Sequence, residues 1–322
     1  MLYCNVYLCG LHSDRKQVLS LRQSLRMVIL SSLLSLTSLF VMLAIPLSAD
    51  ASAVSGRGHF MQPKGVHTAA APFASTNNLT YNGGPVVTGT ANVFAIFWEP
   101  TGSFVSSSYN SLIQRFFNDV HGTTYYTILK QYKNGSGSGP VTGRLAGTFV
   151  DTRSYPSNPI FDSDIQNEVS HAQSVKGWTS SVNNLFFVFT ARGENECFDT
   201  SQSECTFTTF CGYHNFFGSN TLYAYLPYTG TNLNACGVPR TPNHDIDSDS
   251  TINVSSHEFA EAVTDPLLNA WFDSSGQEIG DKCAFQFSST TSANGDTTMN
   301  GDPYEIQLEW DNARGACRLN TP

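Results

Sequence analysis

"NLFFVFTA", residues 184–191, is the strongest indication of the fold, because it is an uninterrupted apolar run of strand length with aromatic and β-branched members. Such a run predicts a buried strand. "NVFAIFW", residues 92–98, has the same character and predicts a second one. The core is therefore expected to contain a sheet whose strands are covered by other elements.

The segments around these two strands alternate between helix and strand. Residues 109–120 place apolar side chains at intervals of three and four, which predicts a helix. Residues 162–178 predict another helix, with Ser163 and Gln166 at the spacing of a capping box. Further strands are predicted from apolar or alternating runs at residues 144–151, 220–228 and 304–310.

This order of elements predicts an α/β (α+β) fold, a single layered domain over residues 91–322 with helices flanking the sheet. The sheet is expected to be mixed, because the strands near residues 185 and 221 lack a helix between them. Residues 54–90 are rich in Gly, Pro, Ala and Asn and are expected to form an extended lead-in.

The first 53 residues have the layout of a secretory signal peptide. Basic residues precede an apolar run from Met27 to about Pro46, and small residues follow it, which favours cleavage after Ala51 or Ala53. A permanent transmembrane anchor is the alternative, because the run approaches the ~20 residues that span a bilayer. Proline and the Ala-x-Ala pattern favour cleavage, so we expect a secreted protein without a stable membrane anchor.

Charge and cysteine content narrow the functional class. The chain has a formal net charge of −9, and the acidic excess grows once the basic signal peptide is removed. This argues against nucleic acid as a partner. Six cysteines remain beyond the signal peptide, an even number that suggests three disulfides in an exported protein. Six cysteines allow fifteen pairings. We expect Cys283–Cys317 among them, because it would tie the segment after the helix described next to the C-terminal region.

"SSHEFAEAVTDP", residues 255–266, carries one histidine and three acids. At about 100° per residue, His257, Glu258 and Glu261 lie on one side of a helix and Phe259 on the other. A solvated outer face of an amphipathic helix explains that pattern. A metal-binding helix explains it too, and the helix by itself does not distinguish the two.

The surrounding charges favour the metal. Between Arg240 and Lys282 there are nine acids and neither Lys nor Arg, whereas a solvated face usually mixes signs. His257 and Glu261 lie one turn apart and can bind one ion, with Glu258 beside it. This is the spacing of the His-Glu-x-x-His metallopeptidases with glutamate in place of the second histidine.

The remaining ligands of a zinc ion are expected outside this helix. "GQEIGDKC" offers Glu278 and Asp281, of which we favour Asp281 as the third ligand. His214, in "CGYHNFF", is an alternative ligand or a donor to a developing oxyanion, and packing among neighbouring aromatic side chains is its structural alternative. In the expected mechanism zinc acidifies a water and Glu258 takes its proton.

A calcium site is a further possibility. "HDIDSDS", residues 244–250, has the alternating aspartates of a calcium loop but has Ser250 and Ser256 where an EF-hand requires glycine and glutamate. A solvated loop that ends in the N-cap of the helix, at Ser250 or Thr251, is the favoured interpretation. The helix is then expected over residues 251–264.

Several blocks together resemble the EXORDIUM/phosphate-induced protein family. They are "YNGGPVVTG", "NVFAIFW", "CGYHNFF", "SSHEFAEAVTDPLLNAWF", "EIGDKC" and "IQLEWDNARGAC", which span roughly residues 81–318. The resemblance implies a secreted or wall-associated protein without a settled biochemical activity. His214, His257, Glu258, Glu261, Glu278 and Asp281 are its matched motif positions. Asp265 stands where the plant pattern has asparagine, so the resemblance does not carry it over as a ligand, and the longer, cysteine-bearing loop 193–211 is divergent. The chain resembles a bacterial-type member of the family.

The leading hypothesis from the sequence is a secreted zinc-dependent hydrolase, a metallopeptidase acting on a peptide or cell-wall-associated substrate. The order of elements is similar to the zincin layout, which is an analogy of fold alone. The first alternative is a non-catalytic extracellular signalling or binding protein with a structural calcium or zinc site. The second is a carbohydrate-binding wall protein that stacks sugars on Trp98, Trp271 and Trp310.

Overall fold

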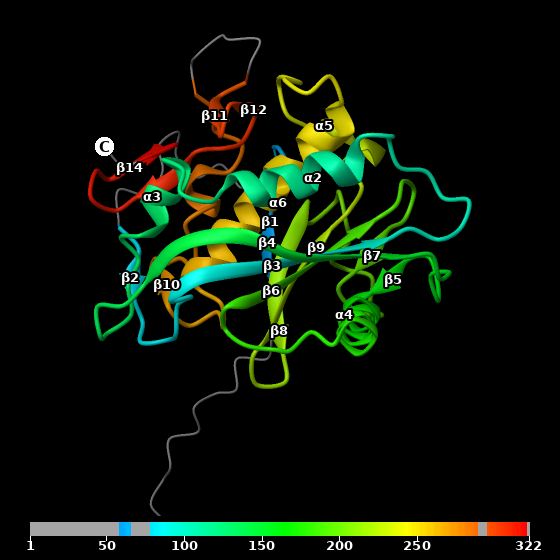
Figure 1. Cartoon of the computed structure of the whole chain (residues 1–322), viewed down its shortest axis with the longest axis horizontal. Coiled ribbons are helices and arrows are strands. Elements are labelled where there is room, and N and C mark those ends of the chain that lie inside the picture. The colour runs from blue at the N-terminus through cyan, green and yellow to red at the C-terminus, as the bar shows by residue number, and fades with distance from the viewer. Residues whose placement is uncertain (1–57, 66–77, 289–294, 321–322) are drawn as a thin grey trace, which may run out of the picture. The chain divides into compact units, whose positions relative to one another are not determined.

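The computed structural model of the chain describes residues 58–65, 78–288 and 295–320 (Figure 1). The predicted signal peptide lies outside these residues. The described residues belong to one compact unit. None of its described helices combines the length and the apolar character needed to cross a membrane.

A six-stranded mixed sheet forms the centre of this unit. Its strands lie in the order β1 (His59–Met61), β8 (Gly212–Phe217), β9 (Thr221–Leu226), β6 (Asn184–Thr190), β3 (Gly89–Trp98) and β4 (Pro140–Asp151). The four strands from β9 to β4 are parallel, whereas β8 and β1 are antiparallel to their neighbours. The predicted mixed sheet is confirmed. However, the strands near 185 and 221 are parallel, and the antiparallel member is β8, which the sequence analysis did not predict.

Both faces of the sheet are covered, because successive side chains of each strand point to opposite faces. In β3, Val93, Ala95 and Phe97 enter one hydrophobic core, and Phe94, Ile96 and Trp98 enter the other. Helices α2 (Tyr109–Asp119), α3 (Tyr125–Leu129) and α6 (Ile246–Thr264) pack on the first core, and α4 (Asp162–Lys176) packs on the second (Figure 1). The prediction of helices flanking a sheet is confirmed.

Two helix starts differ from the expectation. Helix α6 begins at Ile246 and not at Thr251, because Asp245 is its N-cap and accepts a bond from the backbone amide of Ser248 at 3.2 Å. Helix α4 has no Ser163–Gln166 capping box. Asp164 in its first turn accepts a hydrogen bond of 2.9 Å from the backbone amide of Phe161, which is the residue before the helix.

The predicted strand at residues 304–310 is wrong for most of its length. Only its two ends are extended, in β12 (Asp302–Tyr304) and β13 (Glu309–Asp311). Its polar residues Glu305, Gln307 and Glu309 are buried along with its apolar ones, so the segment crosses the interior and has no solvent-facing side.

The remaining elements are short: β2 (Thr80–Tyr81), β5 (Ile160–Phe161), β7 (Glu196–Cys197), η1 (Thr229–Thr231), α5 (Leu233–Cys236), β10 (Trp271–Phe272), η2 (Asp281–Cys283), β11 (Thr297–Met299) and β14 (Ala316–Arg318). The lead-in therefore contributes two short strands, β1 and β2, and β1 lies at an edge of the central sheet.

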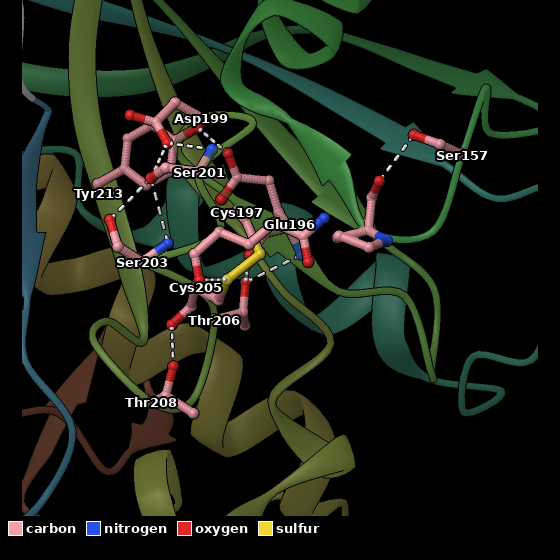
Figure 2. Close-up of a disulfide and its surroundings, with 12 residues drawn as sticks. Ser157, Glu196, Cys197, Asp199, Ser201, Ser203, Cys205, Thr206, Thr208 and Tyr213 are labelled. Atoms are coloured by element: carbon pink, nitrogen blue, oxygen red, sulfur yellow. Dashed lines mark hydrogen bonds between the residues drawn. A yellow bond between two sulfur atoms is a disulfide. The ribbon is translucent and has the colours of Figure 1, made fainter.

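Three disulfides join the six cysteines, as expected. Cys283–Cys317 is among them and ties η2 to β14. Cys211–Cys236 ties the start of β8 to α5. Cys197–Cys205 closes a loop beside Glu196 and Tyr213, and the Tyr213 hydroxyl donates to Glu196 over 3.0 Å (Figure 2).

Candidate metal centre

Helix α6 is buried on all sides from Ser248 onward, which excludes the solvated-face interpretation of its acids. His257, Glu258 and Glu261 are each 0% exposed. The helix lies between β8 and β9 on one side and α2 on another. An explanation based on a solvated outer face is therefore wrong, and these ionisable groups need partners inside the protein.

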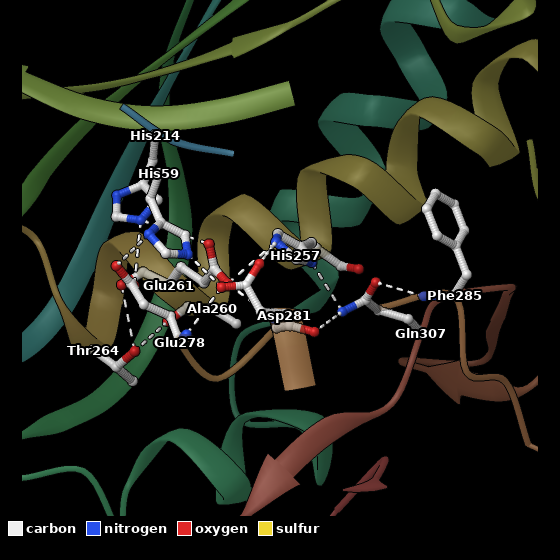
Figure 3. A network of polar contacts seen from close by, with 12 residues as sticks. His59, His214, His257, Ala260, Glu261, Thr264, Glu278, Asp281, Phe285 and Gln307 are labelled. Atoms are coloured by element: carbon white, nitrogen blue, oxygen red, sulfur yellow. Dashed lines mark hydrogen bonds and ion pairs between the residues drawn. The ribbon is translucent and has the colours of Figure 1, made fainter. Parts of the chain in front are cut away.

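One helical turn brings His257 and Glu261 together, as their spacing predicts. His257 Nε2 lies 3.1 Å from Glu261 Oε1 (Figure 3). Glu258 also reaches this point, since His257, Glu258 and Glu261 can each direct one ligand atom to within 4.8 Å of the others. Both carboxylate oxygens of Glu258 are buried without a hydrogen-bond partner among the described residues.

The segment after α6 returns two acids to the same place. Asp281 Oδ1 lies 3.7 Å from His257 Nε2, and the Asp281 backbone amide donates to Glu261 Oε1 over 3.1 Å. The Glu278 backbone amide donates to Asp281 Oδ2 over 2.9 Å, which closes a tight turn. The Cys283–Cys317 disulfide ties down the η2 turn that carries Asp281.

His214 joins the cluster from the sheet. It lies on β8 and is 1% exposed, with Nε2 at 3.3 Å from Glu278 Oε2 and 3.6 Å from Glu261 Oε2. Strand alternation places the neighbouring Tyr213 in the opposite core. His214 is thus surrounded by carboxylates, and aromatic packing does not account for its position.

A third histidine, His59, was not anticipated. Strand β1 pairs with β8 so that His59 lies opposite His214, with ring centroids 5.9 Å apart. His59 Nε2 contacts Asp281 Oδ2, and its Nδ1 lies 3.4 Å from Glu278 Oε1 (Figure 3). No spacing signal marks this residue, because it comes from the lead-in and meets Asp281 across 222 residues.

Two glycines and one glutamine shape the surroundings of the cluster. A Cβ on Gly280 would lie 2.7 Å from His257 Nδ1, and one on Gly212 would lie 2.7 Å from Val254 Cγ1 and 3.3 Å from Glu258 Oε1. Gln307 Nε2 donates to Gly280 O over 2.9 Å and lies 3.0 Å from His257 Nδ1 (Figure 3). The ring of His257 is held so that Nε2 faces the carboxylates.

The histidines respond to the acids around them in different ways. Burial opposes the protonation of His59, but Asp281, Glu278 and Glu261 outweigh it and hold the pKa of His59 well above its usual range. Burial opposes the protonation of His257 too, and Glu261 raises its pKa to about 9. Burial and the two neighbouring histidines hold the pKa of His214 well below its usual range.

The carboxyl groups are shifted by the same forces. Burial raises the pKa of Glu258 well above its ordinary value, with His257 acting in the opposite direction. Burial likewise raises the pKa of Glu278, opposed by His59. Burial also acts to raise the pKa of Asp281, but His59 outweighs it and the value falls to about 2. Protons on His59 and His257 supply positive charge that a divalent cation can replace.

The aspartates before the cluster have other roles. Asp245 accepts bonds from the hydroxyls of Ser106 and Ser108, each at 2.5 Å, and Asp249 accepts from Asn243 Nδ2 at 2.6 Å. Asp247 accepts from the Tyr228 hydroxyl at 2.6 Å. Donors of the chain thus occupy the carboxylates of residues 244–250, and Asp245 in addition caps helix α6 by accepting from the Ser248 backbone amide.

The three tryptophans considered for sugar stacking, Trp98, Trp271 and Trp310, do not form a stacking platform. Trp98 is 4% exposed and Trp310 is 2% exposed, and both belong to the hydrophobic cores. Trp271 lies between the rings of Tyr81 and Tyr132 at centroid distances of 5.5 and 5.3 Å. Core packing, the default for such residues, describes them better.

Comparison with known proteins gives a distant relationship. The chain is 26% identical over 255 residues to Protein EXORDIUM-like 5 of Arabidopsis thaliana, covering 67% of each chain. It is 24% identical over 242 residues to Protein EXORDIUM-like 3 of the same plant, covering 64% of this chain and 68% of the relative. No protein-family model and no solved structure matches the chain. The two similarities support the EXORDIUM family, and neither name states an activity.

Proposed function

We propose that the buried group around helix α6 is a divalent-metal centre and that the protein is a secreted metal-dependent hydrolase. This group, the α6 cluster, consists of His59, His214, His257, Glu258, Glu261, Glu278 and Asp281. Buried nitrogen and oxygen atoms that face one another without hydrogen-bond partners carry this proposal. The mixture of imidazole and carboxylate suits zinc, whereas calcium prefers oxygen ligands alone. Calcium is the less suitable ion for this donor set.

His257, Glu261 and Asp281 would hold the ion, because Nε2 of His257 lies 3.1 Å from Glu261 Oε1 and 3.7 Å from Asp281 Oδ1. Zinc supplies an acidified water when bound. Glu258 lies beside the ligands and would accept the proton of that water, then deliver it to the leaving amine of a peptide bond. His214, kept neutral by its low pKa, would contribute a ligand or a hydrogen bond to the substrate.

The setting proposed for this activity is extracellular. Three disulfides fit an oxidising compartment. With the predicted signal peptide removed, the protein would act on a peptide or cell-wall-associated substrate and would carry no membrane anchor. A zincin-like arrangement of the sheet and α6 stays part of this proposal.

The proposal is tested by metal analysis combined with Glu258→Gln. We expect bound zinc in both the wild-type protein and the variant, and about 10²–10⁴-fold slower peptide hydrolysis in the variant, because the general base is lost while the ligands remain. Glu194→Gln is the matched control, because Glu194 is a buried acid away from the cluster. Equal activity of the Glu258 variant and wild type would contradict the catalytic role.

A second candidate is a non-catalytic extracellular protein with a structural zinc ion. Complete burial of His257, Glu258 and Glu261 favours it, because a substrate must reach Glu258 for catalysis. The distant similarity to EXORDIUM-like proteins agrees with it. This candidate predicts bound zinc, loss of folding stability on zinc removal, and no hydrolysis of any peptide in a random-sequence library.

A further inference from the structure

We propose that the cluster binds two divalent cations bridged by Glu261; this inference rests on the metal centre proposed above. The two oxygens of Glu261 face different imidazoles. Oε1 lies 3.1 Å from His257 Nε2, and Oε2 lies 3.6 Å from His214 Nε2. A carboxylate in this position can give one oxygen to each of two ions.

The remaining ligand atoms divide into two sets around these oxygens. His257 Nε2, Glu261 Oε1 and Asp281 Oδ1 form the first set, and His214 Nε2, Glu261 Oε2 and Glu278 Oε2 form the second. Ligand atoms about 2.0–2.1 Å from a tetrahedral zinc lie roughly 3.3–3.4 Å from one another. The histidine-to-carboxylate distances are 3.1 and 3.7 Å in the first set and 3.6 and 3.3 Å in the second. The second set has the size of a zinc site, and the two histidine-to-carboxylate distances of the first set are compatible with one.

The second set has no other explanation in the hydrogen bonds of the protein. His214 Nε2, Glu261 Oε2 and Glu278 Oε2 are all buried and lack a hydrogen-bond partner within the described part of the chain. His214, Glu261 and Glu278 also form one of the groups whose ligand atoms lie within 4.8 Å of one another. Three unpartnered buried atoms that converge on one point are the expected lining of an ion site.

Charge balance favours two ions over one. Five buried or nearly buried carboxyl groups influence one another here: Glu258, Glu261, Glu278, Asp281 and Glu309. In the described residues, the ion pairs of Glu261, Glu278 and Asp281 are all with histidine. One divalent cation balances two carboxylate charges and two balance four, so with a single ion the remaining carboxyl groups would have to stay protonated or pair with protonated histidines.

His59 connects the two sets. Its Nε2 contacts Asp281 of the first set, and its Nδ1 lies 3.4 Å from Glu278 of the second. His59, Glu261 and Asp281 also form a group whose ligand atoms lie within 4.8 Å of one another, so this imidazole could complete the ligand shell of an ion. Two ions bridged by a carboxylate would lie about 3.5–4 Å apart, the spacing at which two-metal hydrolases hold the attacking and leaving atoms of a substrate.

Zinc stoichiometry of the purified full chain tests the inference. We expect two zinc ions per chain in the wild type and one in Glu278→Gln and in His214→Ala, each with an unchanged circular dichroism spectrum. His121→Ala, at an exposed histidine away from the cluster, is the control and should keep two. One zinc ion in the wild type would overturn the second site and leave the proposed function intact, whereas no bound zinc would overturn both.

Cobalt tests the bridge itself. The second equivalent of Co²⁺ is expected to weaken the electron paramagnetic resonance signal of the first, because spins that share Glu261 couple to each other. Glu261→Gln should remove this coupling. Two bound Co²⁺ ions with simply additive signals would show that the ions do not share Glu261.

Discussion

Two groups of buried acids lie on opposite faces of the central sheet, and they are neutralised in different ways. On the α4 face, Asp151 and Glu168 are 4% and 1% exposed and share Arg153, whose guanidinium lies 2.6 Å from an oxygen of each. On the α6 face, the described contacts of Glu261, Glu278 and Asp281 with positive groups are to histidines alone.

The difference separates a structural ion pair from a binding site. Arg153 is permanently charged, so the α4 group carries its own counter-charge, with His171 3.6 Å from Asp151 as a second basic neighbour. Histidine gives up its proton readily, and its free nitrogen then becomes a ligand. Buried acids together with histidine and without arginine or lysine therefore indicate a cation site, whereas buried acids with arginine indicate a closed network.

Metal removal should produce the largest contrast between the two groups. With zinc at about 1,000 times its dissociation constant, binding adds about 4 kcal/mol to the free energy of unfolding, which a chelator would remove. Urea unfolding with and without EDTA measures this difference. Glu261→Gln should show no such difference, because the ligand shared by both sides of the cluster is gone. Superimposable wild-type curves would rule out a stabilising ion.

Gln307→Ala should weaken zinc binding about 10–100-fold, since partners that orient a ligand contribute at this level. Gln307 lies against Nδ1 of His257 through its amide nitrogen, and its amide oxygen must turn to the ring to accept the Nδ1 proton of an imidazole that binds zinc through Nε2. Competition with a chromophoric zinc chelator measures the dissociation constant. Gln173→Ala is the control, because Gln173 bonds Ser180 on the α4 side. An unchanged dissociation constant for Gln307→Ala would mean that the close contact with the backbone at Gly280 is enough to orient the His257 imidazole.

Arg153→Met should lower the free energy of unfolding by about 1–2 kcal/mol. It removes the cation that contacts both Asp151 and Glu168 and leaves His171, 3.6 Å from Asp151, as a remaining basic neighbour, and the cost is reduced because the Arg153 side chain is 52% exposed. Zinc content should not change. Adding Glu168→Gln to this variant should restore part of the loss, as chemical denaturation would show. Complete additivity of the two substitutions would contradict the shared network.

The pH dependence of stability should show the smallest effect. Burial and the nearby Asp151 raise the pKa of Glu168 to about 8, against 4.5 as the ordinary value. The folded protein thus holds a proton that the unfolded chain releases, so this contribution is present at low pH and is lost as the pH rises through 8. Unfolding free energy should fall by about 1 kcal/mol between pH 7 and pH 8.

Glu168→Gln isolates that contribution. The variant should show a flatter pH profile than the wild type over the same interval, measured by urea unfolding at each pH. Parallel profiles would show that Glu168 does not titrate there. The α6 cluster makes its own contribution in both proteins, so the difference between the profiles reports the α4 group alone.

The interior of the fold could be predicted from the sequence because its signals are local. Uninterrupted apolar runs marked β3 and β6, and helical spacing marked α2. The pairing of Cys283 with Cys317 was also anticipated. Strand β8 escaped prediction because its segment mixes Tyr213 and the phenylalanines with His214 and Asn215, which shows no clear alternation.

Of the cluster, the sequence predicts with certainty only the neighbours that lie one helical turn apart. His257 and Glu261 are neighbours by helix geometry alone, whereas His214 and His59 enter through the register of three strands. The burial of all sides of α6 was also hidden, since serine, threonine and asparagine on its polar side suggested solvent. Some of these residues bond neighbouring elements, as when Asn253 Oδ1 accepts from the Gln307 backbone amide at 2.7 Å, and others, such as Ser255, donate to carbonyl groups of α6 itself.

The edge strand β1 has a consequence for how the protein matures. His59 stands near the start of the described chain, and its partner Asp281 follows 222 residues later. The two residues emerge from the ribosome in that order, so the cluster cannot form until nearly the whole polypeptide has been synthesised. In an exported protein, the ions would then be acquired after translocation, from the supply outside the cell.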